Sequence, residues 1–203
     1  MNCSEILLLP SIDFNYMTNS IVESNVFYGN AIAAELSGCQ KCEVITNIIN
    51  CVAGIWVNFN GHSNIIANNT INNSTEFGIS YCGINGRIEN NTVSNAYDGI
   101  TIGFAILTRI SRNVVKNCEF GIIDGFSLLS FISSNDFEKN KINAVVIDSL
   151  LSIWRRNYWE RPRILPKYIP TIFGLPGGLD YGSGFIIPWF KFDFRPALKP
   201  NHQ

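Results

Sequence analysis

The chain has 203 residues, of which 46% are hydrophobic and 15% are charged. A chain of this length is about one domain, and its apolar content is too high for a disordered protein. Fifteen Lys and Arg against sixteen Asp and Glu leave a net charge of −1, so the concentrated basic field of a general nucleic-acid binder is absent. No apolar run reaches the roughly eighteen residues of a membrane-spanning helix. We therefore expect neither a nucleic-acid partner nor a transmembrane span.

The first residues carry no visible export signal and break the pattern that follows them. The apolar run from Ile6 to Leu9 ends at Pro10, and no Lys or Arg precedes Lys41, whereas a secretory signal needs a basic start and a longer apolar core. We expect residues 1–18 to form a degenerate repeat unit or an N-terminal cap. The alternative, in which further repeats and a signal peptide precede them, stays open. The protein is then either a monomer or the C-terminal part of a longer chain.

Residues 19–159 carry a 22-residue repeat that is marked by asparagine. An apolar column stands two positions after each marking Asn, from Phe27 to Trp159, and another stands three positions before it, from Val22 to Trp154. A unit with short alternating strands and no helical period cannot bury its apolar side alone, so the units must stack. The sequence therefore predicts an all-β, right-handed, single-stranded parallel β-helix. The marking residues, one in each of about seven coils, are Asn25, Asn47, Asn69, Asn91, Asn113, Asn135 and Asn157.

These asparagines are predicted to form a structural ladder in one tight turn. Asparagine adopts left-handed backbone at low cost, and its amide bonds to local backbone or to a stacked amide. Several asparagines also fit the N-glycosylation pattern, but the fixed phase explains the column without sugar.

A second motif, Gly-Ile, recurs further along each unit. It begins at Gly54, Gly78, Gly99 and Gly121, with spacings of 24, 21 and 22 residues, so the loop before it must absorb small insertions. The Asn-x-apolar and Gly-Ile-x-apolar pattern resembles the parallel β-helix repeats of the pectin-lyase-like superfamily, especially NosD-type and archaeal cell-surface proteins. The resemblance implies an extracellular or cell-surface location. It does not choose among lyases, hydrolases, adhesins and copper-maturation accessories, because one fold carries many functions.

Residues 160–203 are predicted to be a different unit, a C-terminal cap. They hold seven of the eight prolines, and proline cannot donate to a central ladder, so the segment should lie across the open end as loop and edge strand. Within it, aromatic and charged residues alternate, which is typical of a half-buried strand. We expect the aromatic face, with Trp154 and Trp159, to plug the last coil; the alternative is a sugar or protein contact. That face is Phe190, Phe192 and Phe194, and the opposite face is Lys191, Asp193 and Arg195.

Candidate catalytic residues are few. Lyases and hydrolases of this fold need a cluster of carboxylates. Glu76 and Asp98 are 22 residues apart and would stack as a pair in the register of the asparagines. In the register of the glycines, Glu76 stacks with Tyr97 and Glu119 instead. We expect no catalytic site and keep Glu76 and Asp98 as the candidates for a lyase or hydrolase.

The cysteines give little sign of a metal site or of the redox compartment. Six cysteines in this length fall short of a disulfide scaffold. Copper handling, the NosD-like alternative, requires soft thiolate, thioether or imidazole ligands, and the chain offers two Met, two His and a single CxxC, Cys39-Gln-Lys-Cys42. We expect Cys51 and Cys118 to fill turns. The sequence predicts no metal site and no cofactor, with a NosD-like copper-processing accessory as an alternative function.

The outward residues after each Gly-Ile motif are better candidates for ligand binding. Trp56 would stack on a sugar ring, and the hydroxyls of Ser80 and Thr101 would bond to it. The sequence therefore predicts a noncatalytic, exported or surface-displayed β-helix module that binds a glycan or a surface protein.

Overall fold

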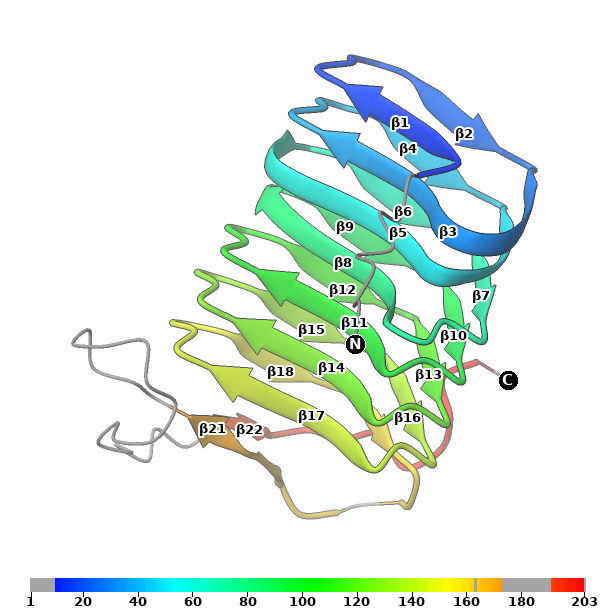
Figure 1. The fold of residues 1–203 in the computed structure, drawn as a ribbon. Coiled ribbons are helices and arrows are strands. Elements are labelled where there is room, and N and C mark those ends of the chain that lie inside the picture. Colours follow the sequence, from blue (N-terminus) through cyan, green and yellow to red (C-terminus); the bar gives the residue numbers. More distant parts are fainter. Residues whose placement is uncertain (1–9, 163, 173–190, 203) are drawn as a thin grey trace, which may run out of the picture.

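The chain winds into a parallel β-solenoid of about seven turns in the computed structural model, which describes residues 10–162, 164–172 and 191–202 (Figure 1). The described residues contain strands and turns and no helix. The named strands pair in parallel, except that β20 and β22 pair antiparallel at the C-terminal end. This confirms the predicted all-β solenoid.

The strands are short, apart from two that bend around a corner. In chain order they are β1 (Ile12–Asn15), β2 (Ile21–Glu23), β3 (Val26–Ser37), β4 (Glu43–Ile45), β5 (Ile48–His62), β6 (Ile65–Ala67), β7 (Thr70–Asn72), β8 (Phe77–Ile84), β9 (Arg87–Glu89), β10 (Thr92–Ser94), β11 (Asp98–Gly103), β12 (Arg109–Ser111), β13 (Val114–Lys116), β14 (Phe120–Gly125), β15 (Phe131–Ser133), β16 (Asp136–Glu138), β17 (Ile142–Ile147), β18 (Ile153–Arg155), β19 (Tyr158–Trp159), β20 (Lys167–Ile169), β21 (Thr171–Ile172) and β22 (Lys191–Asp193).

Three faces surround the core. The first contains β8, β11, β14 and β17, the second contains β7, β10, β13 and β16, and the third contains β6, β9, β12, β15 and β18. The long strands β3 and β5 run from the second face into the first, so these two faces form one 13-stranded sheet, while the third belongs to a separate 9-stranded sheet.

The two apolar columns fill the interior. Residues at the same position of the repeat lie opposite one another on neighbouring strands. Val93, for example, lies opposite Ile71 and Val115. Every member is buried, which agrees with the 22-residue period: Val22, Val44, Ile66, Ile88, Ile110, Ile132 and Trp154 in one column, and Phe27, Ile49, Ile71, Val93, Val115, Phe137 and Trp159 in the other.

The asparagine ladder runs continuously from Asn25 to Asn157. The main-chain N–H of Asn91 donates to Oδ1 of Asn113 at 2.9 Å, and its Nδ2 donates to the same oxygen at 3.0 Å and to the Ile66 carbonyl at 2.9 Å. The other inner rungs repeat this pattern. Each amide therefore joins its own coil to the coils on both sides.

The backbone reason given for the asparagines is wrong. The left-handed residue is the one immediately before each ladder position, with φ of +57° at Asn90 and +56° at Arg112, and the ladder asparagines are not among the residues with positive φ. Their side chains point into the turn, where the amide reaches the neighbouring coils. The column is selected for hydrogen bonding by a buried amide rather than for a permissive backbone.

The Gly-Ile column exists because successive backbones approach closely. A Cβ on Gly99 would lie 2.4 Å from Val115 Cγ1 and 2.5 Å from the Gly121 carbonyl oxygen, which is closer than any side chain permits. The uneven spacing is absorbed in the preceding loop, so that Ile55, Ile79 and Ile100 still lie in register.

The C-terminal strand closes the solenoid with the face opposite to the predicted one. Asp193 is fully buried, whereas Phe194 is 71% exposed; Phe192 is half-buried, and Phe190 lies outside the described residues. Asp193 turns inward because the last coil presents unpaired N–H groups, and a carboxylate accepts them where a phenyl ring would not. Trp154 and Trp159 do lie in the core, with ring centroids 6.0 Å apart.

The N-terminal residues that the structure describes form part of a coil. Strand β1 pairs with β3 in the same 22-residue register, Ile12 opposite Ala34, and Ile12 and Phe14 pack against the core. Residues 1–9 lie outside the described residues, so the boundaries after residues 18 and 159 stay a prediction. Within the described part of the chain, no helix has the length and apolar character that crossing a membrane requires.

Candidate functional site

The Cys39–Cys42 pair occupies a corner of the second coil, between β3 and β4. Both side chains are fully buried. The Cys39 thiol donates to the Phe14 carbonyl at 3.1 Å, and the Cys42 thiol donates to the Met17 carbonyl at 3.5 Å. Both sulfurs therefore point toward the preceding coil, and they form a dithiol at one corner.

Burial keeps the Cys39 thiol of this pair protonated. Burial raises the pKa of the Cys39 thiol, a backbone hydrogen bond from the Met17 region lowers it less, and the neighbouring Cys42 thiol raises it further. Cys39 is thus a neutral thiol near pH 7, and a cation that binds there must displace its proton.

Met17 is a third residue with a soft donor atom, and its backbone lies beside this corner in the adjacent coil. It stands 22 residues before Cys39, in the adjacent coil, where its carbonyl accepts the Gln40 N–H at 2.9 Å. Met17 is 43% exposed, so it lies at the surface beside the two buried thiols. Among the described residues, no group of three or more His, Cys, Asp and Glu is placed to hold a metal ion. Any metal at the corner would therefore rely on two thiolates and the thioether, a donor set that fits Cu(I).

All five cysteines that the structure describes are free thiols. Cys51 and Cys118 are buried, and the Cys118 N–H donates to the Asn140 side chain at 2.9 Å in a second, shorter set of amide contacts. Cys51 lies within β5 and Cys118 lies between β13 and β14, so the two cysteines do not form a pair. The filling role expected for these two cysteines stays a prediction.

Trp56, Ser80 and Thr101 lie opposite one another on β5, β8 and β11. The column continues with the apolar Ile123. All three predicted ligand-binding side chains are half-buried, and the Trp56 ring packs edge-on against Phe77 with centroids 6.4 Å apart. The first face therefore presents the Trp56 indole and the Ser80 side chain in a row, whereas the hydroxyl oxygen of Thr101 is buried.

The two candidate carboxylates are offset by one position. Asp98 lies opposite Phe77 and Phe120, which is the register of the glycines, and its N–H donates to the Glu76 carbonyl at 2.8 Å. Glu76 is exposed, while Asp98 is half-buried and its pKa is raised by desolvation. The side chains thus do not stack as the pair that the asparagine register suggested.

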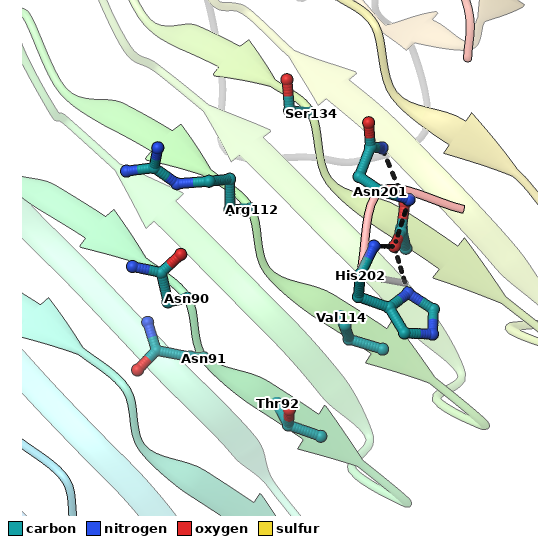
Figure 2. Close-up of a pocket in the computed structure, with 9 residues that line it drawn as sticks. Asn90, Asn91, Thr92, Arg112, Val114, Ser134, Asn201 and His202 are labelled. Carbon is teal, nitrogen blue, oxygen red and sulfur yellow. Dashed lines mark hydrogen bonds and ion pairs between the residues drawn. The ribbon is translucent and has the colours of Figure 1, made fainter. Parts of the chain in front are cut away.

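A polar pocket on the second face was missed by the sequence analysis (Figure 2). It has a volume of about 270 Å³, and Arg112 lies across it from His202. The Asp136 carboxylate, 1% exposed, accepts the N–H and Nδ2 of Asn201, the N–H of His202 at 3.0 Å and the His202 Nδ1. The C-terminal segment thereby saturates Asp136, which acts as its anchor. The sequence feature that could have revealed this pocket is Asp136, a carboxylate at a position where the preceding coils have Thr92 and Val114.

A buried carboxylate near the C-terminal end was also missed. Asp124 points into the core and is fully buried, and it accepts the hydroxyls of Ser130 at 3.5 Å and of Ser152. Desolvation raises its pKa, although the serine hydrogen bonds and the positive charge of Lys191 oppose the shift. The sequence feature that could have revealed it is a charged residue at an inward-facing position of the repeat, where the neighbouring coils have Ile102 and Val146.

Comparison with known proteins identifies the family to which the chain belongs. The model of the family described as "Periplasmic copper-binding protein (NosD)" matches residues 9–171. No curated protein matches the chain. Among solved structures, QnrB1, a plasmid-mediated fluoroquinolone resistance protein, is 13% identical, with 71% of this chain and 86% of that chain covered and a TM-score of 0.23. The family match extends from the first described coil to β21, and this chain therefore belongs to the NosD family.

Proposed function

We propose that this protein is a noncatalytic, exported β-helix module that binds Cu(I) as cargo at the corner of Cys39, Cys42 and Met17. Membership in a family described as periplasmic and copper-binding supports both the location and the metal. The observation that carries the assignment is the dithiol: two fully buried thiols at one corner, directed at the same neighbouring coil.

The chemistry follows from the donors. Soft sulfur ligands select Cu(I) over the harder divalent metals. Binding releases the thiol protons, which at present are donated to the carbonyls of Phe14 and Met17. The solenoid holds both cysteines on a rigid turn, and the partly exposed Met17 gives the ion a path from solvent.

Anaerobic Cu(I) titration of the full chain against a chromophoric Cu(I) chelator tests this proposal. We expect one equivalent to bind, and Cys39→Ser with Cys42→Ser to weaken the affinity by at least about a hundredfold, since two thiolate ligands are lost. Met17→Leu keeps the volume and removes only the thioether, so we expect a smaller loss of about tenfold. Cys118→Ser is the matched control, a buried cysteine outside the corner. If the Cu(I) affinity of the double serine variant equals that of the wild type, Cys39 and Cys42 are not the copper ligands.

Glycan binding by Trp56, Ser80 and Thr101 is the second candidate, because these side chains lie in one row on the first face. Calorimetric titration with neutral and uronate-containing oligosaccharides tests it. Trp56→Ala should reduce the affinity about tenfold or more if the indole stacks on a sugar. The same polysaccharides test for a lyase or hydrolase, and turnover that is lost in Glu76→Gln or Asp98→Asn would show that the module is an enzyme.

A further inference from the structure

The C-terminal end of the chain is basic, although the whole chain is nearly neutral. Residues 153–203 hold eight Lys and Arg and three Asp and Glu, whereas residues 1–152 hold seven Lys and Arg and thirteen Asp and Glu. The net charge of −1 is therefore the sum of acidic coils and a basic end. A local excess of one sign of charge attracts ligands of the opposite sign.

A pocket of about 580 Å³ lies at this end, between the last coil and the C-terminal segment. Arg156 lines it from the turn before β19, and Arg195 and Lys199 line it from the segment after β22. In Figure 1 that segment is drawn in red and passes beside β16. The volume is in the range of small-molecule sites. No Asp or Glu lines the pocket; the remaining lining residues are Pro196, Ala197, Leu198, Pro200 and Asn201.

The three cationic side chains of this pocket lack acidic partners. Among the described residues, none of Arg156, Arg195 and Lys199 forms an ion pair. The carboxylates that contact the segment, Asp136 and Asp193, are buried and already accept several N–H groups each. Three cations therefore meet in one pocket, and the fold supplies no exposed carboxylate among the lining residues to neutralise them.

Hydrogen bonds hold the walls of the pocket in place. The Arg156 N–H donates to the Arg195 carbonyl at 2.9 Å, and the Ala197 N–H donates to the Asn157 carbonyl at 2.9 Å. The Asn201 Nδ2 donates to the Arg156 carbonyl at 3.3 Å. Two prolines in the same segment restrict its backbone further. The backbone that carries the three cations is thus fixed before a ligand arrives, which lowers the entropic cost of binding.

The fold does not require arginine at position 156. Arg156 has φ of +58°, a left-handed backbone that asparagine adopts more readily than arginine. Arg112 is the other arginine at this position of the repeat, and it lines the adjacent polar pocket, which shares Asn201 with this one. The remaining coils have Ser24, Thr46, Asn68, Asn90 and Ser134 there.

We propose that this pocket binds a small organic oxyanion with two or more negative charges, whose charged groups are carboxylates or phosphates. The guanidinium groups of Arg156 and Arg195 donate paired hydrogen bonds to such groups, and Lys199 adds a third positive charge. A monovalent anion would leave two of the three cations without a partner. The proline, alanine and leucine side chains of the wall contact the carbon skeleton. This site lies in the last coil and the end segment, apart from the dithiol of the second coil, and does not depend on copper.

Isothermal titration calorimetry of the metal-free full chain with sodium citrate and with sodium pyrophosphate tests this proposal. The pocket variant is Arg156→Asn, Arg195→Gln and Lys199→Gln, in which asparagine suits the left-handed backbone. We expect the wild type to bind one equivalent of probe, with an affinity that falls as sodium chloride is raised. The pocket variant should bind at least about tenfold more weakly, and acetate should bind the wild type at least about tenfold more weakly than citrate. If only one of the two probes binds, the proposal stands and that probe identifies the charged group.

The matched control is Lys116→Gln, Lys139→Gln and Arg155→Gln, which removes the same number of positive charges outside the pocket. We expect it to bind as the wild type does. The proposal is overturned if neither probe binds, if the pocket variant binds as tightly as the wild type, or if the control loses as much affinity as the pocket variant. The last result would show attraction to net charge alone. If the pocket variant unfolds, Arg156→Asn is measured by itself, and the same outcomes decide.

Discussion

The carboxylate of Asp193 ends the asparagine ladder by taking the place of the next amide. Its Oδ2 accepts the N–H of Asn157 at 2.9 Å, the Nδ2 of Asn157 at 3.0 Å and the Nε1 of Trp159 at 3.2 Å. Its Oδ1 accepts the N–H groups of Arg156 at 3.1 Å and Arg195 at 3.2 Å. One carboxylate thus satisfies the whole open end of the ladder, and Asp193→Ala removes every one of these acceptors.

The three donors to Oδ2 belong to Asn157 and Trp159, both of which are buried, so their loss sets the magnitude. A buried donor without a partner costs about 1–3 kcal/mol. Water at the end of the solenoid will recover part of this, and we expect Asp193→Ala to cost about 3–5 kcal/mol. Asp193→Asn keeps one acceptor oxygen, the atom that each inner rung uses, and should cost only about 1 kcal/mol.

Urea unfolding followed by tryptophan fluorescence is the assay, because Trp154 and Trp159 report on the last coil. Stability in a solenoid is nearly a sum over neighbouring coils, so hydrogen exchange should show the loss first in β18 and β19 and least in β6 and β7. The reasoning is refuted if Asp193→Ala unfolds at the wild-type urea concentration, or if Asp193→Asn is as unstable as Asp193→Ala.

Four further predictions concern the core and the end segment. Asn91→Ala should cost about 2–4 kcal/mol in urea unfolding because it leaves buried groups of two coils unpaired; a cost below that of an exposed substitution would show that the ladder is dispensable. Gly99→Ala should cost at least about 2 kcal/mol, because its Cβ would meet backbone at 2.5 Å, and a neutral effect would contradict the close approach. The raised pKa of Asp124 means that the folded chain keeps this proton to higher pH than the unfolded chain, so the free energy of unfolding falls as pH rises above the usual carboxyl pKa near 3.8. Asp124→Asn should lack this fall and be more stable than the wild type at neutral pH, and parallel pH profiles of the two proteins would refute the assignment. Deleting residues 160–203 should expose the last coil and cause association in sedimentation velocity, and a stable monomer would show that the segment is not a cap.

The 22-residue period made most of the fold predictable. Neighbouring coils are one strand spacing apart, so any residue that recurs at one phase must contact its own kind. The columns that begin at Val22 and Phe27 therefore had to be the core, and they are buried. The uneven Gly-Ile spacing likewise showed where the insertion lies, and Asp98 takes the register of the glycines.

The parts that the sequence did not reveal depend on contacts outside the period. Alternation in β22 shows that the strand has two faces but not which face turns inward. The choice depends on unpaired donors from Asn157 and Trp159, which come from another coil. The anchor at Asp136 depends on Asn201 and His202, which lie in the C-terminal segment beyond the last coil, where the repeat pattern has ended. Capping segments are aperiodic, so they lack the internal comparison that the coils provide.

The repeat also allows each unusual residue to be compared with the residues at the same position in the other coils. At the phase of Cys42, the other coils have Ser20, Asn64, Gly86, Thr108, Ser130 and Ser152, so a thiol is not required there for folding. The Asn64 side chain satisfies the Cys42 N–H at 2.9 Å, and the thiol bonds only to carbonyls. The fold therefore does not explain why a second thiol stands beside Cys39. Copper is assigned to this corner because it holds a thiol that the other coils do without.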